Sequence, residues 1–222
     1  MSYSFYEIYI TAQRAFTAMG FPYGSDEDAA FIIAWLELNN FQGIKILANL
    51  ISEMDQKYEG KIEINNLNEK INFKNKSILM KGAGLIDYLN SEIKNKNKIS
   101  INIINCKDGI LFLPLLYKKS EYVNSYQLTF HDVNNEIKTY EIIDKEIILC
   151  QKKYNDLLNK NTVCIVINNN KEKVNNSNKS SIISEKKIQK NLAQSIKPKS
   201  DSWDKITKLA NKTFVPESEE SR

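Results

Sequence analysis

The sequence predicts an α+β fold with an N-terminal three-helix unit, a mainly antiparallel sheet and a C-terminal helical tail. Residues 25–43 are apolar on nearly every side, with helix-ending residues behind them. From Lys98 onward, apolar and polar residues alternate in several short runs. These runs follow one another mostly in hairpin order, which favours an antiparallel sheet over alternating strand–helix–strand units.

The central element of the N-terminal unit is the helix expected over residues 25–43. Ser25 precedes Asp28 by three positions, a spacing that predicts a side-chain cap at Ser25. Asn39, Asn40 and Gly43 leave helical geometry easily and predict its end. A helix that is apolar all round must be wrapped by other elements, so we expect neighbours on several sides.

Two amphipathic helices are expected to clamp this central helix. The first begins at Ser4, with Glu7 three residues on, and ends at Gly20. The third runs from about Gly43 to Tyr58 with one apolar face. Each would bury its apolar face against the central helix.

The middle of the chain predicts one helix and a set of strands. Residues 60–77 suit either one or two short strands or a polar loop, and a helix of about ten residues is expected around Gly82 and Gly84. Pro114, after an apolar run at 110–113, marks a strand end or a helix start. Strands are predicted near residues 99–103, 126–130, 137–142, 147–150 and 163–167, with a hairpin turn at 133–135.

These patterns predict four parts: a helical unit (1–58), an α+β sheet region (59–167), a flexible linker rich in lysine and asparagine (168–200) and a docking tail (201–222). Within the linker, Ser184 to Ile196 suits a solvated helix. In the tail, Trp203 is too large to stay in water, so we expect this segment to dock onto the body.

Composition limits the classes of partner. The 222 residues carry a net charge of +4, and Lys, Asn and Ile are abundant, as in proteins encoded by AT-rich genomes. The lysine-rich stretch 171–199 lacks arginines for base contacts and interleaved aromatic residues, so we expect no nucleic-acid partner. No apolar run is long enough to span a bilayer and no signal-peptide pattern opens the chain, which favours a cytoplasmic protein without membrane contact.

Few residues suit catalysis or metal binding. Cys106, Cys150 and Cys164 show no paired spacing, and with the single His131 they predict no metal site and no cofactor; buried, reduced thiols in strands are expected. His131 suits a surface turn. Lys81-Gly82-Ala83-Gly84 indicates a tightly packed helix entry rather than a phosphate loop.

Several pieces of the chain resemble a bacterial family of proteins of unknown function, the one numbered 3726. They are Tyr3 to Gly20, Trp35-Leu36 followed by Gly43, the segment 82–87, the run 111–114, and the terminal tryptophan with TFVPESEESR. This resemblance implies no activity, because none is assigned to the family.

A second likeness is limited to the N-terminal helices. The capped Asp-Ala-Ala helix and the closing Asn-Phe-Gln-Gly look like the opening of the malate/L-lactate dehydrogenase type 2 family. Those enzymes carry Ser-His-Gly shortly after that glycine, where this chain has Ile44-Lys45-Ile46. The likeness therefore implies no hydride-transfer site here.

We expect an accessory or binding protein for a small metabolite or a partner protein, because a substantial core is combined with few catalytic residue types. The candidate contact residues are Gly84, Asp87, Trp203, Pro216, Ser218 and Arg222. The alternative is an enzyme with a dispersed carboxylate and hydroxyl site in a sheet-edge cleft. Its candidate residues are Asp87, Asp132, Tyr117 and Ser218.

Overall fold

The computed structural model describes residues 1–64, 70–150, 158–169 and 181–213. The chain divides into two compact units, each described by itself below. Unit 1 combines Met1–Tyr58 with Asn191–Arg222, and unit 2 comprises Glu59–Lys190. Unit 1 is therefore built from the two ends of the chain.

Unit 1 is a helical bundle. Its helices are α1 (Phe5–Ala18), α2 (Ser25–Leu38), α3 (Gly43–Met54) and α7 (Ser200–Ala210), followed by the short 3-10 helix η3 (Asn211–Thr213). α2 packs against both α1 and α3. Its apolar side chains are buried along its length except for the half-buried Phe31, and Trp35 is 3% exposed. The expected all-apolar central helix, wrapped by its neighbours, is confirmed.

The helix starts differ in how they are capped. At α1 the Ser4 hydroxyl accepts the Glu7 amide (3.2 Å) and the Glu7 carboxylate accepts the Ser4 amide (2.7 Å), so the expected capping box is confirmed. The expected Ser25 cap is wrong. Gly24, with φ of 85°, takes the N-cap position, and the Ser25 hydroxyl lies inside the helix, 2.8 Å from the Tyr58 hydroxyl. Glycine adopts this positive φ without strain, so the helix begins at Ser25 and not after it.

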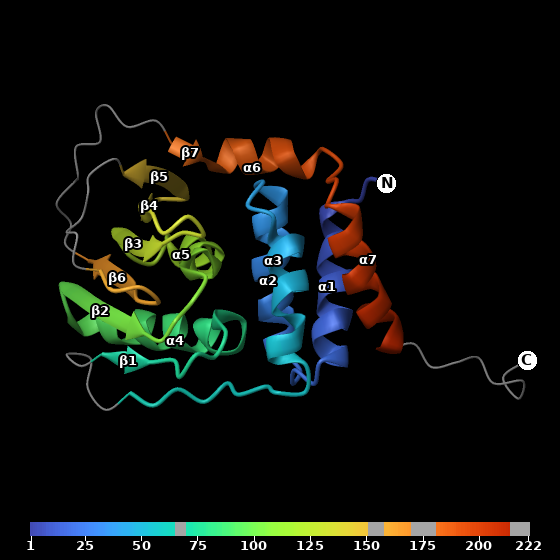
Figure 1. Ribbon diagram of the computed structural model, residues 1–222. Helices are drawn as coiled ribbons and strands as arrows, with labels where there is room; N and C mark the ends of the chain where they lie inside the picture. The colour runs from blue at the N-terminus through green and yellow to red at the C-terminus, as the bar shows by residue number, and fades with distance from the viewer. Residues whose placement is uncertain (65–69, 151–157, 170–180, 214–222) are drawn as a thin grey trace, which may run out of the picture. The chain divides into compact units, whose positions relative to one another are not determined.

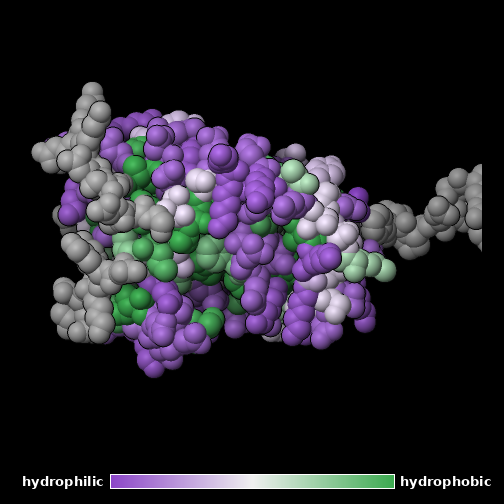
Figure 2. Space-filling view, turned by 90° about the horizontal axis from the view of Figure 1, so that it is seen from above, coloured by the Kyte–Doolittle hydropathy of each residue, from purple (hydrophilic) through white to green (hydrophobic). Residues whose placement is uncertain are grey.

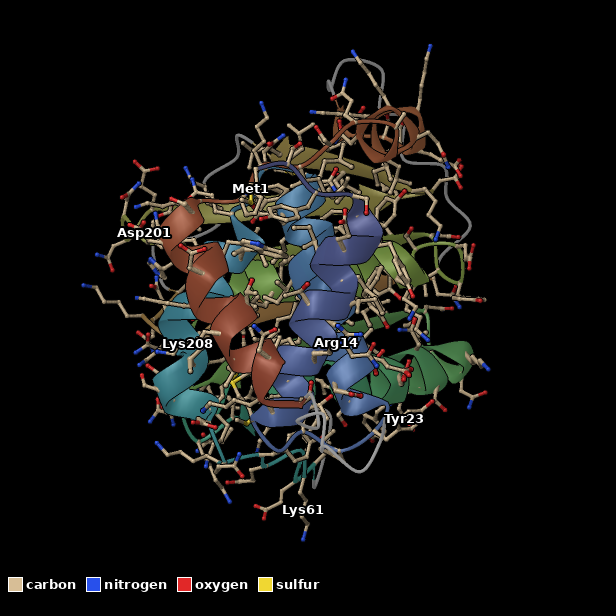
Figure 3. All side chains as sticks on the ribbon, turned by 90° about the vertical axis from the view of Figure 1, so that its right-hand side faces the viewer. Met1, Arg14, Tyr23, Lys61, Asp201 and Lys208 are labelled. Atoms are coloured by element: carbon tan, nitrogen blue, oxygen red, sulfur yellow. The ribbon has the colours of Figure 1, made fainter. Side chains whose placement is uncertain are left out.

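The C-terminal helix α7 lies beside α1, as Figures 1 and 3 show, and also packs against α3. Trp203 is 7% exposed, and its ring centroid lies 4.4 Å from that of Tyr3. Ile206, Leu209 and Ala210 are buried on the same side of α7. The apolar faces of α1 and α3 are thus covered by a segment from the other end of the chain.

Unit 2 contains a seven-stranded sheet in the order β1-β2-β6-β3-β4-β5-β7. All neighbouring strands are antiparallel except β1 and β2. The strands are β1 (Ile71–Asn72), β2 (Lys98–Ile104), β3 (Ser125–His131), β4 (Ile137–Ile143), β5 (Glu146–Cys150), β6 (Val163–Asn168) and β7 (Ser181–Ile183). The mainly antiparallel sheet is confirmed.

Helices pack against one face of this sheet. They are α4 (Ile78–Glu92), followed by the 3-10 helix η1 (Ile93–Asn95), and α5 (Leu113–Lys119), preceded by the 3-10 helix η2 (Gly109–Phe112). Ile101, Ile165 and Leu128 stand side by side on one sheet face and are buried. Tyr126, on the same face, donates its hydroxyl hydrogen to Asn90 of α4. Figure 1 shows α4 and α5 on the same side of the strands.

One local expectation in unit 2 is corrected, and two open alternatives are decided. α4 begins at Ile78 behind a Ser77 cap, so Gly82 and Gly84 lie inside the helix rather than at its entry. Of the two alternatives at Pro114, the structure shows the helix start, because η2 leads directly into α5, where Pro114 occupies the first turn. Of the open alternatives for 60–77, the described part of that stretch contains one strand, the two-residue β1.

The cysteines are also placed differently. Cys106 is buried but follows β2 instead of lying in a strand, whereas Cys150 on β5 and Cys164 on β6 are partly exposed. None of these three cysteines forms a disulfide in the described part of the chain. Burial raises the pKa of the Cys106 thiol strongly, which keeps it protonated and unreactive.

Helix α6 (Glu185–Leu192) carries the chain from unit 2 back to unit 1. It confirms the helix expected within Ser184–Ile196, while residues 170–180 of the predicted linker lie outside the described residues. Ile188 is its one buried side chain. Figure 2 shows hydrophilic residues gathered in the middle of the surface seen from above, over α6. No helix in the described ranges is long and apolar enough to cross a membrane.

Candidate binding site

A pocket of about 710 Å³ lies within unit 1, between two stretches that are far apart in sequence. One stretch contains the last turn of α2, the following turn and the start of α3; the other is 191–199, which joins α6 to α7. The pocket is lined by Glu37, Lys45, Lys197, Lys199, Asn40, Gln42, Asn191, Gln194, Ser195, Leu38 and Ile196. Its lining is therefore mainly polar, with three cationic side chains and one anionic side chain.

The tight corner between α2 and α3 shapes one wall of the pocket. Asn40 and Gln42 adopt positive φ angles of 65° and 55°. Gly43 lies so close to α2 that an added Cβ would stand 2.2 Å from the carbonyl oxygen of Ile33. Only glycine permits this approach, which brings the first amides of α3 next to the end of α2.

Glu37, in the last turn of α2, caps the start of α3 with its side chain. Its Oε2 accepts the Ile44 amide at 2.9 Å. Glu37 is half-buried, and this burial raises the pKa of its carboxyl group, while the hydrogen bond from Ile44 opposes the rise. A carboxylate with a raised pKa in a pocket is a common feature of functional sites.

The second wall is held in place by backbone and amide contacts. The Asn191 side-chain amide donates to the Leu38 carbonyl and to Asn39 Oδ1, both at 3.3 Å. Ile196 pairs with Tyr3 through two backbone hydrogen bonds of 2.8 and 2.7 Å. The Trp203 ring packs on Tyr3, the partner of Ile196 in this pairing. The segment 191–199 is thus tied at both ends to the bundle.

Three lysines line the opening. The Lys45 ammonium donates to Gln42 Oε1 at 3.1 Å, and the side chains of Lys197 and Lys199 are exposed. Lys199 occupies the N-cap position of α7, where it supplies its backbone carbonyl to the amides of Ser202 and Trp203. Lysine ammonium groups at a pocket mouth attract anionic ligands.

The predicted contact residues do not form this pocket. Gly84 lies within α4, where an added Cβ would meet open space, and Asp87 pairs with Lys119 of α5 at 2.7 Å while 61% of its side chain is exposed. Trp203 has a packing role beside the pocket. Pro216, Ser218 and Arg222 lie outside the described residues, so partner binding by the tail stays a prediction.

The described residues of the predicted enzyme site have separate structural roles in unit 2, and Ser218 lies outside the described residues. Asp132 closes the β3–β4 turn, where its Oδ1 accepts the amides of Asn134 and Glu136. The Tyr117 ring lies under the Lys145 ammonium, 5.3 Å away. His131 ends β3, and its two ring nitrogens lie 3.3 and 2.7 Å from backbone carbonyl oxygens, as suits a structural histidine. The described parts of the chain hold no cluster of metal-ligating side chains.

Sequence reasoning missed Glu37, Lys45, Lys197 and Lys199. In the sequence, Glu37 and Lys45 look like ordinary polar residues near helix ends. Lys197 and Lys199 look like part of the solvated lysine-rich stretch 171–199. The one available signal was the turn Asn39-Asn40-Phe41-Gln42-Gly43, whose residues tolerate positive φ and so predict a sharp corner. Nothing in the local pattern indicates that residues 191–199 lie opposite that corner.

Comparison with known proteins supports the two resemblances drawn from the sequence. The family model described as a protein of unknown function (DUF3726) matches residues 3–105, which confirms the first resemblance over that range. The chain matches no curated protein.

Solved structures with a similar fold are dehydrogenases. A putative malate/lactate dehydrogenase from E. coli superposes with a TM-score of 0.67 at 8% identity, covering 100% of this chain and 97% of its own. Malate dehydrogenase from Entamoeba histolytica superposes with a TM-score of 0.64 at 6% identity, and the match covers 98% of this chain and 99% of that protein. Sulfolactate dehydrogenase from Methanocaldococcus jannaschii superposes with a TM-score of 0.60 at 8% identity, and the match covers 96% of this chain and 97% of that protein. At such identities the likeness shows the fold alone, and it confirms the second resemblance.

Proposed function

We propose that this protein binds a small metabolite that carries a carboxylate, in the pocket of unit 1. The single observation that carries the proposal is the lining of that pocket, which combines three lysines with one glutamate. The volume of about 710 Å³ is in the range of small-molecule sites. A carboxylate entering it would gain charge-assisted hydrogen bonds from ammonium groups.

The names of the structural neighbours support the same class of ligand. Malate, lactate and sulfolactate, named in those proteins' descriptions, are all small anions with a carboxylate. A fold can keep a binding preference while its chemistry changes, although fold likeness alone does not assign a function. The neighbours therefore suggest which anions to test first.

Titration calorimetry at low ionic strength, with malate and lactate as ligands, tests the proposal. We expect both anions to bind, and we expect the variant Lys197→Gln/Lys199→Gln to weaken binding about tenfold or more, because each lost ammonium contact is charge-assisted. Low salt is needed because exposed charges are screened.

The matched control is Lys208→Gln, which removes an exposed lysine of α7 two turns beyond the pocket (Figure 3). It should leave the affinity within about twofold of the parent, since long-range charge effects at an exposed position are small. Absence of binding, or an equal loss in Lys208→Gln, would contradict the proposal.

A second candidate function is enzymatic, because the structural neighbours are dehydrogenases. The Ser-His-Gly of that family has no counterpart here, since Ile44 and Lys45 follow Gly43. The chain's single histidine, His131, is bonded to backbone carbonyls in unit 2. No hydride-transfer step is assigned to these residues. Conversion of malate or lactate to the oxo acid, with a nicotinamide cofactor added, would favour the enzyme over the binding protein.

A further inference from the structure

Glu37 faces the same pocket as the lysines without a positive partner. No described lysine or arginine forms a salt bridge with it. Its Oε2 accepts the Ile44 amide, and no described donor bonds to Oε1. The nearest lysine in sequence, Lys45, directs its ammonium to Gln42 instead.

Partial burial of this carboxylate costs the empty protein free energy, because it removes part of the hydration of the charge. A carboxylate has about four acceptor positions, and Oε1 is not among the buried unpartnered atoms of the described residues, so it stays open to the pocket and available to a donor on a ligand. Burial is the main cause of the raised pKa of Glu37, which indicates that its charge is poorly compensated. A ligand that donates hydrogen bonds or positive charge at this point would relieve the cost.

The lysines on the other wall of the pocket favour an anionic group on the ligand, whereas Glu37 favours a donor or a positive charge. Lys197 and Lys199 belong to the segment before α7, across the pocket from the α2–α3 corner that holds Glu37. A ligand that satisfies both walls must carry an anionic group and a donor group a short distance apart.

From this we infer that the preferred ligand is an amino acid, with its carboxylate toward the lysines and its ammonium on Glu37 Oε1. The inference rests on the proposed carboxylate site and narrows its ligand class. An ammonium provides three donors and a full positive charge, whereas a hydroxyl provides one donor and no charge. The amine should therefore contribute more than the hydroxyl of a hydroxy acid.

Two sets of ligands that differ only at carbon 2 test this inference by calorimetry near neutral pH. One set is aspartate, malate and succinate, and the other is alanine, lactate and propionate. We expect the amino acid of at least one set to bind about tenfold more tightly than the member without a donor, with the hydroxy acid between them. Using two sets covers ligands with one and two carboxylates.

The variant Glu37→Gln provides the second readout. Its side-chain carbonyl can still accept the Ile44 amide, so the α2–α3 corner should stay folded, which a melting curve checks. We expect the preference for the amine over the unsubstituted acid to fall to about twofold or less, because the amide carries no charge. Lys208→Gln, the control used above, should keep the full preference.

The outcomes separate the two proposals. Equal binding of the three members in both sets, or an amine preference that survives Glu37→Gln, overturns the amino-acid inference and leaves the carboxylate site in place. If none of the six ligands binds, the carboxylate site itself is wrong.

Discussion

At the scale of single residues, Glu37 occupies a position with opposing electrostatic effects. It lies in the last turn of α2, where the helix dipole disfavours a negative charge, and beside the first turn of α3, where the dipole favours one. Burial then raises the pKa of its carboxyl group. A carboxyl whose pKa is higher in the folded than in the unfolded protein stabilises the fold below the unfolded pKa. This contribution is lost as the pH rises through the folded value.

Glu37→Gln should therefore raise the melting temperature relative to the parent more at pH 7.5 than at pH 4. At the higher pH the substitution removes an ionised, half-buried group, whereas at the lower pH the parent side chain already becomes protonated. Thermal unfolding at both pH values measures the difference. Glu53→Gln, an exposed position on α3, is the control. An equal pH-dependent gain there would show that net charge, and not burial, is the cause.

At the scale of secondary-structure elements, two glycines inside helices have opposite roles. Gly43 begins α3 in contact with the backbone of α2, where an added Cβ would stand 2.2 Å from Ile33 O and 3.0 Å from Glu37 N. Gly84 lies within α4, where an added Cβ would meet nothing within 4 Å. The first is required by packing, and the second only increases the freedom of the unfolded chain.

Gly43→Ala should reduce the free energy of unfolding by about 3 kcal/mol, because backbone atoms cannot rotate away from the added methyl group. Gly84→Ala should increase it by about 0.5 to 1 kcal/mol, the difference in helix propensity. Urea unfolding of both variants measures the two effects with the same chemical change. A Gly43→Ala variant as stable as the parent would rule out the close α2–α3 corner.

At the scale of the whole molecule, unit 1 depends on both ends of the chain. α7 packs on α1 and α3, and Trp203 lies against Tyr3 near the start of the sequence. The pocket has the same origin, since Asn191 and Leu38, which share a hydrogen bond, are separated by 153 positions. The candidate site thus exists only when the C-terminal segment is in place.

A chain that ends at Lys199 should unfold at a lower temperature than the parent and bind a hydrophobic dye, because the apolar faces of α1 and α3 lose their cover. Loss of the buried Trp203 alone should cost about 3 to 5 kcal/mol. The control is a chain that ends at Thr213, which keeps all of α7 and should melt near the parent temperature. Parent-like melting of the shorter chain would show that α7 adds no stability.

The sequence by itself determined the apolar central helix, the capping box of α1 and the alternating strands of the sheet. These features depend on neighbours within a few positions, so periodicity and capping residues are enough to predict them. Only the tertiary structure decided that Glu37 accepts a hydrogen bond from the first turn of α3 and that residues 191–199 lie across the pocket from the α2–α3 corner. Such contacts depend on how helices pack, and no local pattern of polar residues encodes which distant segment will face them.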